Sequence, residues 1–232
     1  MTERPILFST PMIKSILAGK KTATRRIVKP QPPDDAGALQ VGRYAPTKVD
    51  RNGLEYPGEE IFGATTLDGE WGVPCPFGGP GDRLWVREAF ARREGVVYRA
   101  DLPDEDEARD WRPSIFMPRE LSRITLTIKD VRVERLQEIT EAAALTEGVE
   151  PRMSSESWTG YDPKTESHPT AFARKTLEHA GCIELKHHPP RELASAREEF
   201  RRLWEALNYK KCGWETNPLV WVVEFTADIR RS

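Results

Sequence analysis

The chain has 232 residues with 35 basic and 37 acidic side chains, which gives a formal net charge of −2. It contains no apolar run near the roughly 20 residues that span a bilayer, and this excludes a membrane-inserted chain. The length is sufficient for a hydrophobic core without metal or disulfide support, so we expect one domain over residues 1–232.

The cysteines predict a reducing compartment. There are three, Cys75, Cys182 and Cys212, and they lack C-x-x-C spacing, which is not typical of a disulfide framework. The first residues lack the apolar core of a signal peptide, so we expect a cytoplasmic protein. No metal or other cofactor is expected, because the one alternative, a zinc site built from Cys182, Cys212, His179, His187 and His188, matches no standard spacing.

The first elements in chain order are a strand, a helix and a second strand. Residues 5–9 form an apolar run, and Thr10-Pro11 then supplies a capping hydroxyl and a proline at the first helical position. Apolar residues recur at helical spacing up to Gly19, a favoured stop, and branched residues over 22–28 predict the next strand.

Residues 29–80 are dense in proline and glycine, which predicts a long insertion with a small hairpin near 61–73. Regular patterns return over 82–90 and 96–100, which we expect to pair around Glu94-Gly95. Residues 122–136 alternate like a long strand, and the change of parity at Lys129-Asp130 predicts a bulge. Trp85 is expected to face the core.

The C-terminal part is predicted to hold two helices and a final strand. Thr140 caps a helix that stops at Gly148, and a polar second insertion occupies about 149–194. Residues 195–207 form an amphipathic helix, residues 219–225 form a strand, and no βαβ rhythm is present. The helix presents Phe200, Leu203, Trp204 and Leu207 on one face. We therefore expect an α+β fold built on a small mixed barrel.

Residues 19–28 carry the most chemistry. Between positions 14 and 29 there are six basic residues and no acidic one, on a chain that is slightly negative overall, which indicates an anionic partner such as a nucleotide or nucleic acid. Lys21 lies three residues before the hydroxyl of Thr24 and could form a nucleophile pair with it. Residues three apart on a strand face opposite sides, so this pairing requires a bend between them.

Four segments together resemble the ASCH domain family. They are residues 17–24 with the pattern G-x-K-x-x-T-x-R completed by Arg26, the strand at 80–88, the helix region 136–148, and the strand at 221–225. This family is a PUA-like β-barrel group that includes small bacterial amidohydrolases acting on N4-acetylcytidine. The chain is most similar to longer members often encoded by phages and prophages. The resemblance implies a PUA-like/ASCH barrel with flanking short helices and insertions at about 29–80 and 149–194.

The resemblance also implies a site and a reaction. The Lys, Thr and Glu of the family's amidohydrolases match Lys21, Thr24 and Glu147. They imply removal of the acyl group from N4-acylated cytosine nucleosides or related modified bases. Thr24 would attack, Lys21 would act as the base if its pKa is lowered, and Glu147 would hold Lys21 or protonate the leaving nitrogen. The alternative is that Lys21 and Thr24 are surface residues beside a turn and that Glu147 is an exposed helix carboxylate.

Further residues are candidates for binding the substrate. The basic residues Lys20, Arg25, Arg26, Arg119 and Arg123 are suited to phosphate, and Trp111 is placed to stack on a base at the rim of a pocket. All could instead belong to solvated faces. The expected partner is a modified nucleoside or nucleotide, or an RNA or DNA that carries one, and not a membrane. The competing functions are a non-catalytic RNA- or DNA-binding module and, less favoured, a metal-dependent nuclease.

Overall fold

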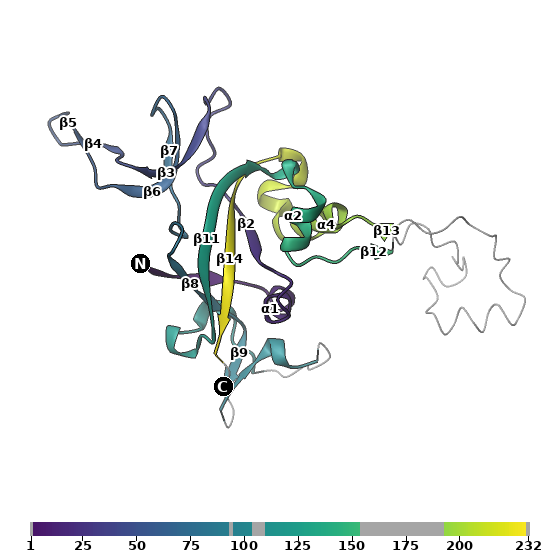
Figure 1. The fold of residues 1–232 in the computed structure, drawn as a ribbon. Helices are drawn as coiled ribbons and strands as arrows, with labels where there is room; N and C mark the ends of the chain where they lie inside the picture. Colours follow the sequence, from purple (N-terminus) through teal and green to yellow (C-terminus); the bar gives the residue numbers. More distant parts are fainter. Residues whose placement is uncertain (1, 93–94, 104–109, 154–192, 231–232) are drawn as a thin grey trace, which may run out of the picture.

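A five-stranded sheet forms the centre of the protein. The computed structural model describes residues 2–92, 95–103, 110–153 and 193–230. The strand order is β1 (Glu3–Leu7), β8 (Arg83–Arg87), β11 (Ile124–Arg135), β14 (Leu219–Ile229) and β2 (Ala23–Ile27). β1 and β8 are parallel, and the other neighbours are antiparallel. The long ribbon of β11 and β14 runs the length of the molecule (Figure 1).

The predicted bulge in the long strand is confirmed. The pairing of β11 with β14 shifts register between Ile128 and Asp130. Up to Ile128 alternate residues of β11 point into the main core, and Val131 does so after the shift. The extra residue thus restores the alternation that a regular strand would have lost, which keeps one face of β11 apolar along its length.

The final strand is longer than expected, and its first part, residues 219–223, is buried on both faces. Trp221, Val223 and Phe225 of β14 join one apolar cluster, whereas Val220 and Val222 join a second. A strand covered on both faces has a continuous apolar run instead of an alternating one, as residues 219–223 have.

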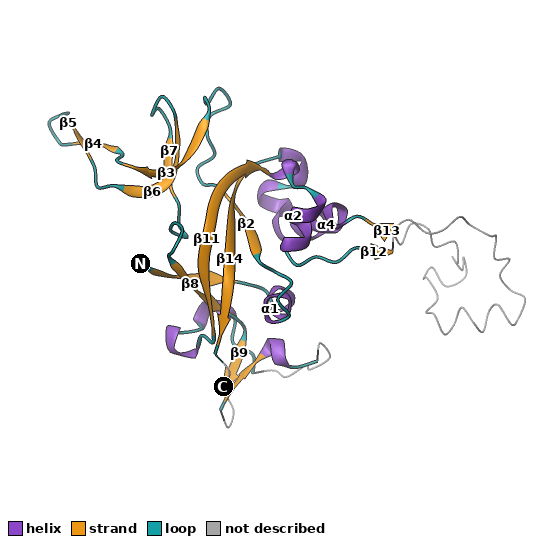
Figure 2. Cartoon of the chain, in the orientation of Figure 1, coloured by secondary structure: helices purple, strands orange, loops and turns teal. Residues whose placement is uncertain are grey.

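Helices cover both faces of the sheet. α1 (Thr10–Leu17) buries Ile13 and Ile16 in the first cluster. α2 (Glu141–Thr146) and α4 (Ala196–Cys212) pack against each other in the second, where α4 contributes Phe200 and Trp204. Figure 2 shows α2 and α4 to one side of the β11–β14 ribbon.

Of the two predicted helix caps, Thr140 is confirmed and Thr10 is not. Thr140 accepts the Ala143 N–H at the start of α2, and Ser195 forms a capping box at the start of α4. The cap of α1 is Ser9, one residue before the predicted Thr10, and its side chain makes no capping hydrogen bond. α4 runs on to Cys212, five residues beyond the predicted end.

Residues 29–80 are more structured than predicted. The expected hairpin is present as β6 (Ile61–Thr66) and β7 (Gly72–Pro74), and β3 (Leu39–Tyr44) extends it to three strands. A further hairpin of β4 (Thr47–Val49) and β5 (Glu55–Pro57) projects from it (Figure 1). Ala64 and Val73 connect this sheet to the main core.

The predicted pairing of residues 82–90 with residues 96–100 is wrong for residues 83–87, which pair with other strands. The chain leaves the sheet after Arg87, and a separate strand β9 (Phe90–Arg92) pairs with β10 (Val96–Tyr98). β8 pairs with β1 and β11 instead. Trp85 does not face the core: it is half-buried, with the guanidinium groups of Arg87 and Arg119 over its ring at 5.3 and 6.0 Å.

Short elements complete the described chain. They are the 3-10 turns η1 (Arg99–Asp101), η2 (Ser114–Phe116), η3 (Arg119–Leu121), η4 (Leu136–Glu138) and η6 (Trp214–Thr216), and the two-residue strands β12 (Arg152–Met153) and β13 (Leu193–Ala194). β12 and β13 pair at the two ends of the predicted second insertion, whose residues 154–192 lie outside the described residues.

The α+β class is confirmed, but no sheet closes into a barrel within the described residues. β1 and β2 are the two edges of the main sheet, and the chain passes between them through α1. In the same described part of the chain, no helix is long and apolar enough to cross a membrane.

Candidate active site

The backbone brings Lys21 and Glu147 together although 126 residues separate them. Lys21 follows α1 and forms an isolated antiparallel bridge with Glu147, which follows α2. The neighbouring Thr22 N–H donates to the Thr146 carbonyl at 2.8 Å. The ends of the two helices are therefore joined by main-chain contacts before any side chain is considered.

Gly148 makes this close approach possible. Its φ of +82° lies in the left-handed region, and a Cβ there would lie 2.1 Å from Ser15 Oγ and 2.9 Å from Lys21 Cβ. Ser15 Oγ instead donates to the Gly148 carbonyl at 3.2 Å. The glycine predicted as a helix stop thus also leaves the space that the Lys21 stem occupies.

The side chains of Lys21 and Glu147 form a buried ion pair. Lys21 Nζ donates to Glu147 Oε2 at 2.6 Å and to the Glu147 carbonyl at 3.0 Å. The side chains are 0% and 4% exposed. The structure therefore differs from the alternative in which these two residues lie on the surface.

Arg25 holds the other oxygen of the same carboxylate. Its Nη1 donates to Glu147 Oε1 at 3.3 Å, and its Nη2 donates to Glu134 Oε2 at 3.0 Å. The guanidinium lies 5.9 Å from the centre of the Phe200 ring. Lys21 and Arg25 are thus balanced by two carboxylates, which offsets much of the cost of burying the charges.

Burial lowers the pKa of the Lys21 amine. Loss of hydration disfavours the ammonium form and is the largest cause, and the charges of Arg26 and Arg25 act in the same direction. Glu147 opposes them because its carboxylate stabilises the charged amine. A larger fraction of the Lys21 amine is therefore neutral near neutral pH than in an exposed lysine, and only the neutral amine can accept a proton.

Thr24 lies on the wall of a cavity of about 450 Å³ that Glu147 also lines. The Thr24 side chain is buried in β2, and no group among the described residues forms a hydrogen bond with its hydroxyl. Lys21 does not line this cavity. The structure therefore joins Lys21 to Glu147 directly and places Glu147 and Thr24 around one space.

The wall opposite β2 comes from α4. It consists of Phe200, Leu203, Trp204, Leu207 and Asn208, with Ser9 and Met12 from the start of α1 at the side. The sequence predicted the apolar face of this helix but gave it no role in the site. The sequence held no separate signal for such a role, because an apolar stripe of this kind is normally core-facing and the 54% exposure of Leu207 is visible only in the structure.

A second and larger cavity of about 880 Å³ adjoins the first. It lies between α1, the segment after α2, and α4. The two cavities share Ser9, Met12, Glu147, Leu203 and Leu207.

Of the three predicted binding residues between positions 20 and 26, two line the smaller cavity and one does not. Arg26 and Arg25 line it, although Arg26 donates to the Leu7 carbonyl at 2.6 Å and lies 5.2 Å over the Phe8 ring. Lys20 is exposed and forms an ion pair with Glu150.

Arg119, Arg123 and Trp111 do not form the opposite wall that the sequence suggested. Arg119 forms a two-point ion pair with Glu3 at 2.9 and 3.0 Å. Trp111 lies under the guanidinium of Arg99, at 5.5 Å. None of the three lines either cavity.

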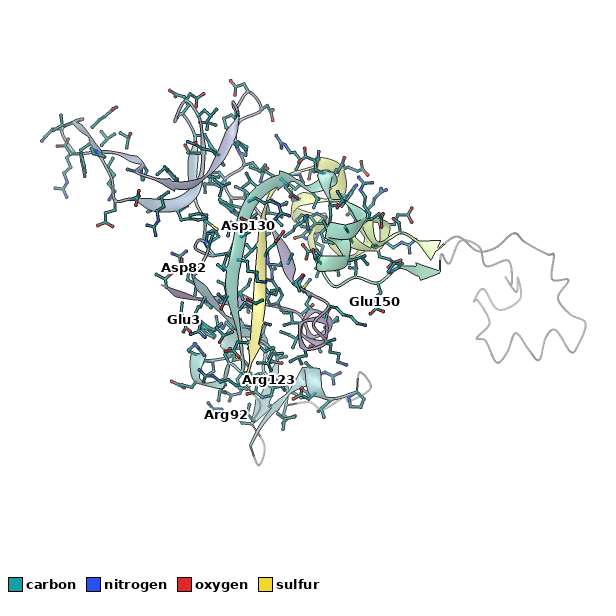
Figure 3. All side chains as sticks on the ribbon, in the orientation of Figure 1. Glu3, Asp82, Arg92, Arg123, Asp130 and Glu150 are labelled. Carbon is teal, nitrogen blue, oxygen red and sulfur yellow. The ribbon has the colours of Figure 1, made fainter. Side chains whose placement is uncertain are left out.

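Arg123 belongs to a separate charged cluster. It holds buried Glu88 at 2.9 and 3.0 Å and Asp101 at 2.7 Å, and it lies 4.0 Å over the Tyr98 ring. Figure 3 shows Arg123 at one end of the ribbon, well apart from Glu150. Its guanidinium donates to these two carboxylates, so a structural role accounts for the position of Arg123 and no ligand is needed to explain it.

No group of three His, Cys, Asp or Glu side chains in the described ranges is placed to hold a metal ion. Of the predicted alternative ligands, Cys212 lies 3.2 Å from the Thr216 hydroxyl. Cys182, His179, His187 and His188 fall outside the described residues. Comparison with family models, curated proteins and solved structures found no match to this chain.

Proposed function

We propose that this protein is an amidohydrolase that removes the acyl group from N4-acylated cytosine nucleosides or related modified bases. The observation that carries the proposal is the buried contact of Lys21 with Glu147 at 2.6 Å, beside a cavity whose wall also contains Thr24. These are the three residues that the resemblance to the ASCH family implies. The cavity of about 450 Å³ falls within the common range for small-molecule sites, roughly 300 to 1,000 Å³.

The positions of the four resembling segments support the same proposal. They contribute β2, β8, α2 and β14, so three are strands of the main sheet and the fourth is the helix that ends just before Glu147. A PUA-like origin of the sheet is part of the proposal.

In the proposed reaction the Thr24 oxygen attacks the acyl carbon, and its proton passes by way of the Glu147 carboxylate to the neutral Lys21 amine. The carbon–nitrogen bond then breaks, and the departing N4 takes this proton back by the same route to give cytidine. Water hydrolyses the acyl-threonine ester, which releases the carboxylic acid and restores the hydroxyl. Glu147 contacts Lys21 and lines the cavity, so it positions the amine and lies where protons pass between the two.

The experiment is hydrolysis of N4-acetylcytidine and N4-benzoylcytidine, with cytidine measured by chromatography. Thr24→Val keeps the shape of the side chain and removes the hydroxyl, and Lys21→Met removes the amine. We expect each to reduce kcat/KM by about 10²- to 10⁴-fold. The exposed Lys20→Met is the matched control and should retain activity.

Two results would overturn the proposal. One is a folded wild-type protein that releases no cytidine from any acylated nucleoside. The other is a Thr24→Val variant as active as the wild type. Salt-dependent binding of RNA or DNA by an inactive wild-type protein would then indicate the non-catalytic module.

A further inference from the structure

The larger cavity gives the candidate site more room than an acetylated nucleoside needs. It has about 880 Å³ and meets the smaller cavity along a common wall that includes Glu147. Thr24 lines only the smaller cavity, whereas Glu147 lies where the two spaces meet. A substrate attacked by Thr24 can therefore occupy the smaller space and extend past Glu147 into the larger one.

The two spaces differ in chemistry. The smaller one is lined by Arg26, Asn208 and Trp204, which suit an aromatic ring with polar edges. Asn208 donates its amide N–H to the Trp204 carbonyl at 3.3 Å, which leaves the amide oxygen as an acceptor. This space fits the cytosine part of the substrate.

Four apolar side chains face the larger space, and three of them, Met12, Leu203 and Leu207, lie where it meets the smaller one. Pro11 and Met12 form one wall from α1, and Leu203 and Leu207 form the other from α4. We call the space between these four residues the acyl groove. Leu207 is 54% exposed, so an apolar ligand in the groove would remove apolar surface from water.

The charges around the acyl groove already have partners. Glu199 forms an ion pair with Arg202 at 2.7 Å, and Glu150 forms one with Lys20. Glu147 is held by Lys21 and Arg25. A phosphodiester in this space would meet three carboxylates. Among the described lining residues the one cation, Arg202, is already paired with Glu199, so a polynucleotide is disfavoured as the occupant.

We propose that the substrate's acyl group is an extended hydrocarbon chain, longer than acetyl, that lies in the acyl groove between α1 and α4. This inference rests on the proposed amidohydrolase function. It adds that Leu203 and Leu207 of α4 contact the acyl chain where it leaves the smaller cavity, which receives the nucleoside.

The test is a series of N4-acylcytidines with straight acyl chains from acetyl to octanoyl. We expect kcat/KM to rise by about two- to fourfold per methylene, because each buried methylene contributes at most about that factor. Leu207→Ser should lower the ratio of octanoyl to acetyl activity by about five- to tenfold. Leu145→Ser is the matched control, because Leu145 is also exposed (47%) but lines neither cavity, and it should leave the ratio unchanged.

A constant or falling kcat/KM along the series, with acetyl still hydrolysed, overturns the inference and leaves the proposed function intact. If no member is hydrolysed, the proposed function fails and calorimetric binding to the wild type decides the inference. Affinity that rises with chain length and weakens in Leu207→Ser supports the groove. Affinity independent of chain length refutes it.

Discussion

Replacing Glu147 by glutamine leaves the Lys21 ammonium buried without its nearest carboxylate. Glutamine has a similar shape and can still accept a hydrogen bond, so the change removes charge with little change of volume. Breaking a buried ion pair from one side costs about 3 to 5 kcal/mol. Lys21 can reduce this cost only by losing its proton.

The size of the effect follows from the ordinary lysine pKa of about 10.4 in the unfolded chain. A folded state that requires neutral Lys21 must release a proton, which costs about 1.4 kcal/mol for each pH unit below that value. The destabilisation of Glu147→Gln is therefore about 4 to 5 kcal/mol at pH 7 and about 2 kcal/mol at pH 9. Arg25 and Arg26 then lower the pKa of Lys21 without opposition from Glu147.

The direction of the pH dependence can be stated in advance. Burial already lowers the pKa of Lys21 in the folded wild type, so the unfolded chain binds more protons between the folded and unfolded pKa values, and stability rises with pH through that window. Removing Glu147 extends the window to lower pH. The stability difference between variant and wild type should therefore shrink as the pH rises from 7 to 10.

The assay is urea unfolding followed by tryptophan fluorescence at several pH values. Glu150→Gln is the matched control, because its ion pair with Lys20 is exposed (57% and 63%) and should change stability by less than about 1 kcal/mol with no added pH slope. Combining Lys21→Met with Glu147→Gln should abolish the slope. A Glu147→Gln destabilisation that is equal at pH 7 and pH 10 would refute the reasoning.

Three further perturbations test the packing around the same site. Gly148→Ala should lower the free energy of unfolding by more than about 2 kcal/mol, because it adds a clash with Ser15 Oγ to left-handed backbone strain of about 1 to 2 kcal/mol. Gly19→Ala is the control, because Gly19 has a φ of +70° and open space around it, so this change should show the strain alone. Equal losses of stability in the two variants would contradict the clash. Arg25→Gln removes the cation that links Glu147 to Glu134, so the free energy of unfolding from urea curves should fall by about 3 kcal/mol. An unchanged free energy would show that the two ion pairs are not needed for stability. Ser195→Ala deletes the α4 capping box and should lower stability by about 1 kcal/mol, a loss that Ser195→Asp should largely avoid.

Elements with strong local signals could be predicted from the sequence. The bulge between Ile128 and Asp130 and the cap at Thr140 are set by neighbouring residues and agree with the structure. β4 and β5 were missed because all their residues are exposed, which leaves no apolar alternation to detect. The break after Arg87 was missed because pairing with β1, far away in the chain, decides where β8 ends.

The candidate site shows the same division between local and distant information. The contact of Lys21 with Glu147 follows from no spacing rule across 126 residues, and only the resemblance suggested it. Arg119 and Arg123 looked available for phosphate because their carboxylate partners, Glu3 and Glu88, are distant in the sequence. Charge runs show which residues are basic but not which are already neutralised.

The main-chain bridge between the ends of α1 and α2 fixes the backbone of the site independently of its side chains. The Thr22 N–H and the bridge at Lys21 hold the two segments by atoms that every residue type except proline possesses. An inactive variant at position 21 or 147 can therefore keep its neighbours in register, which makes it a suitable host for chemical rescue by added amines or carboxylates. The same anchoring allows the chain between the two segments to change in length without separating them.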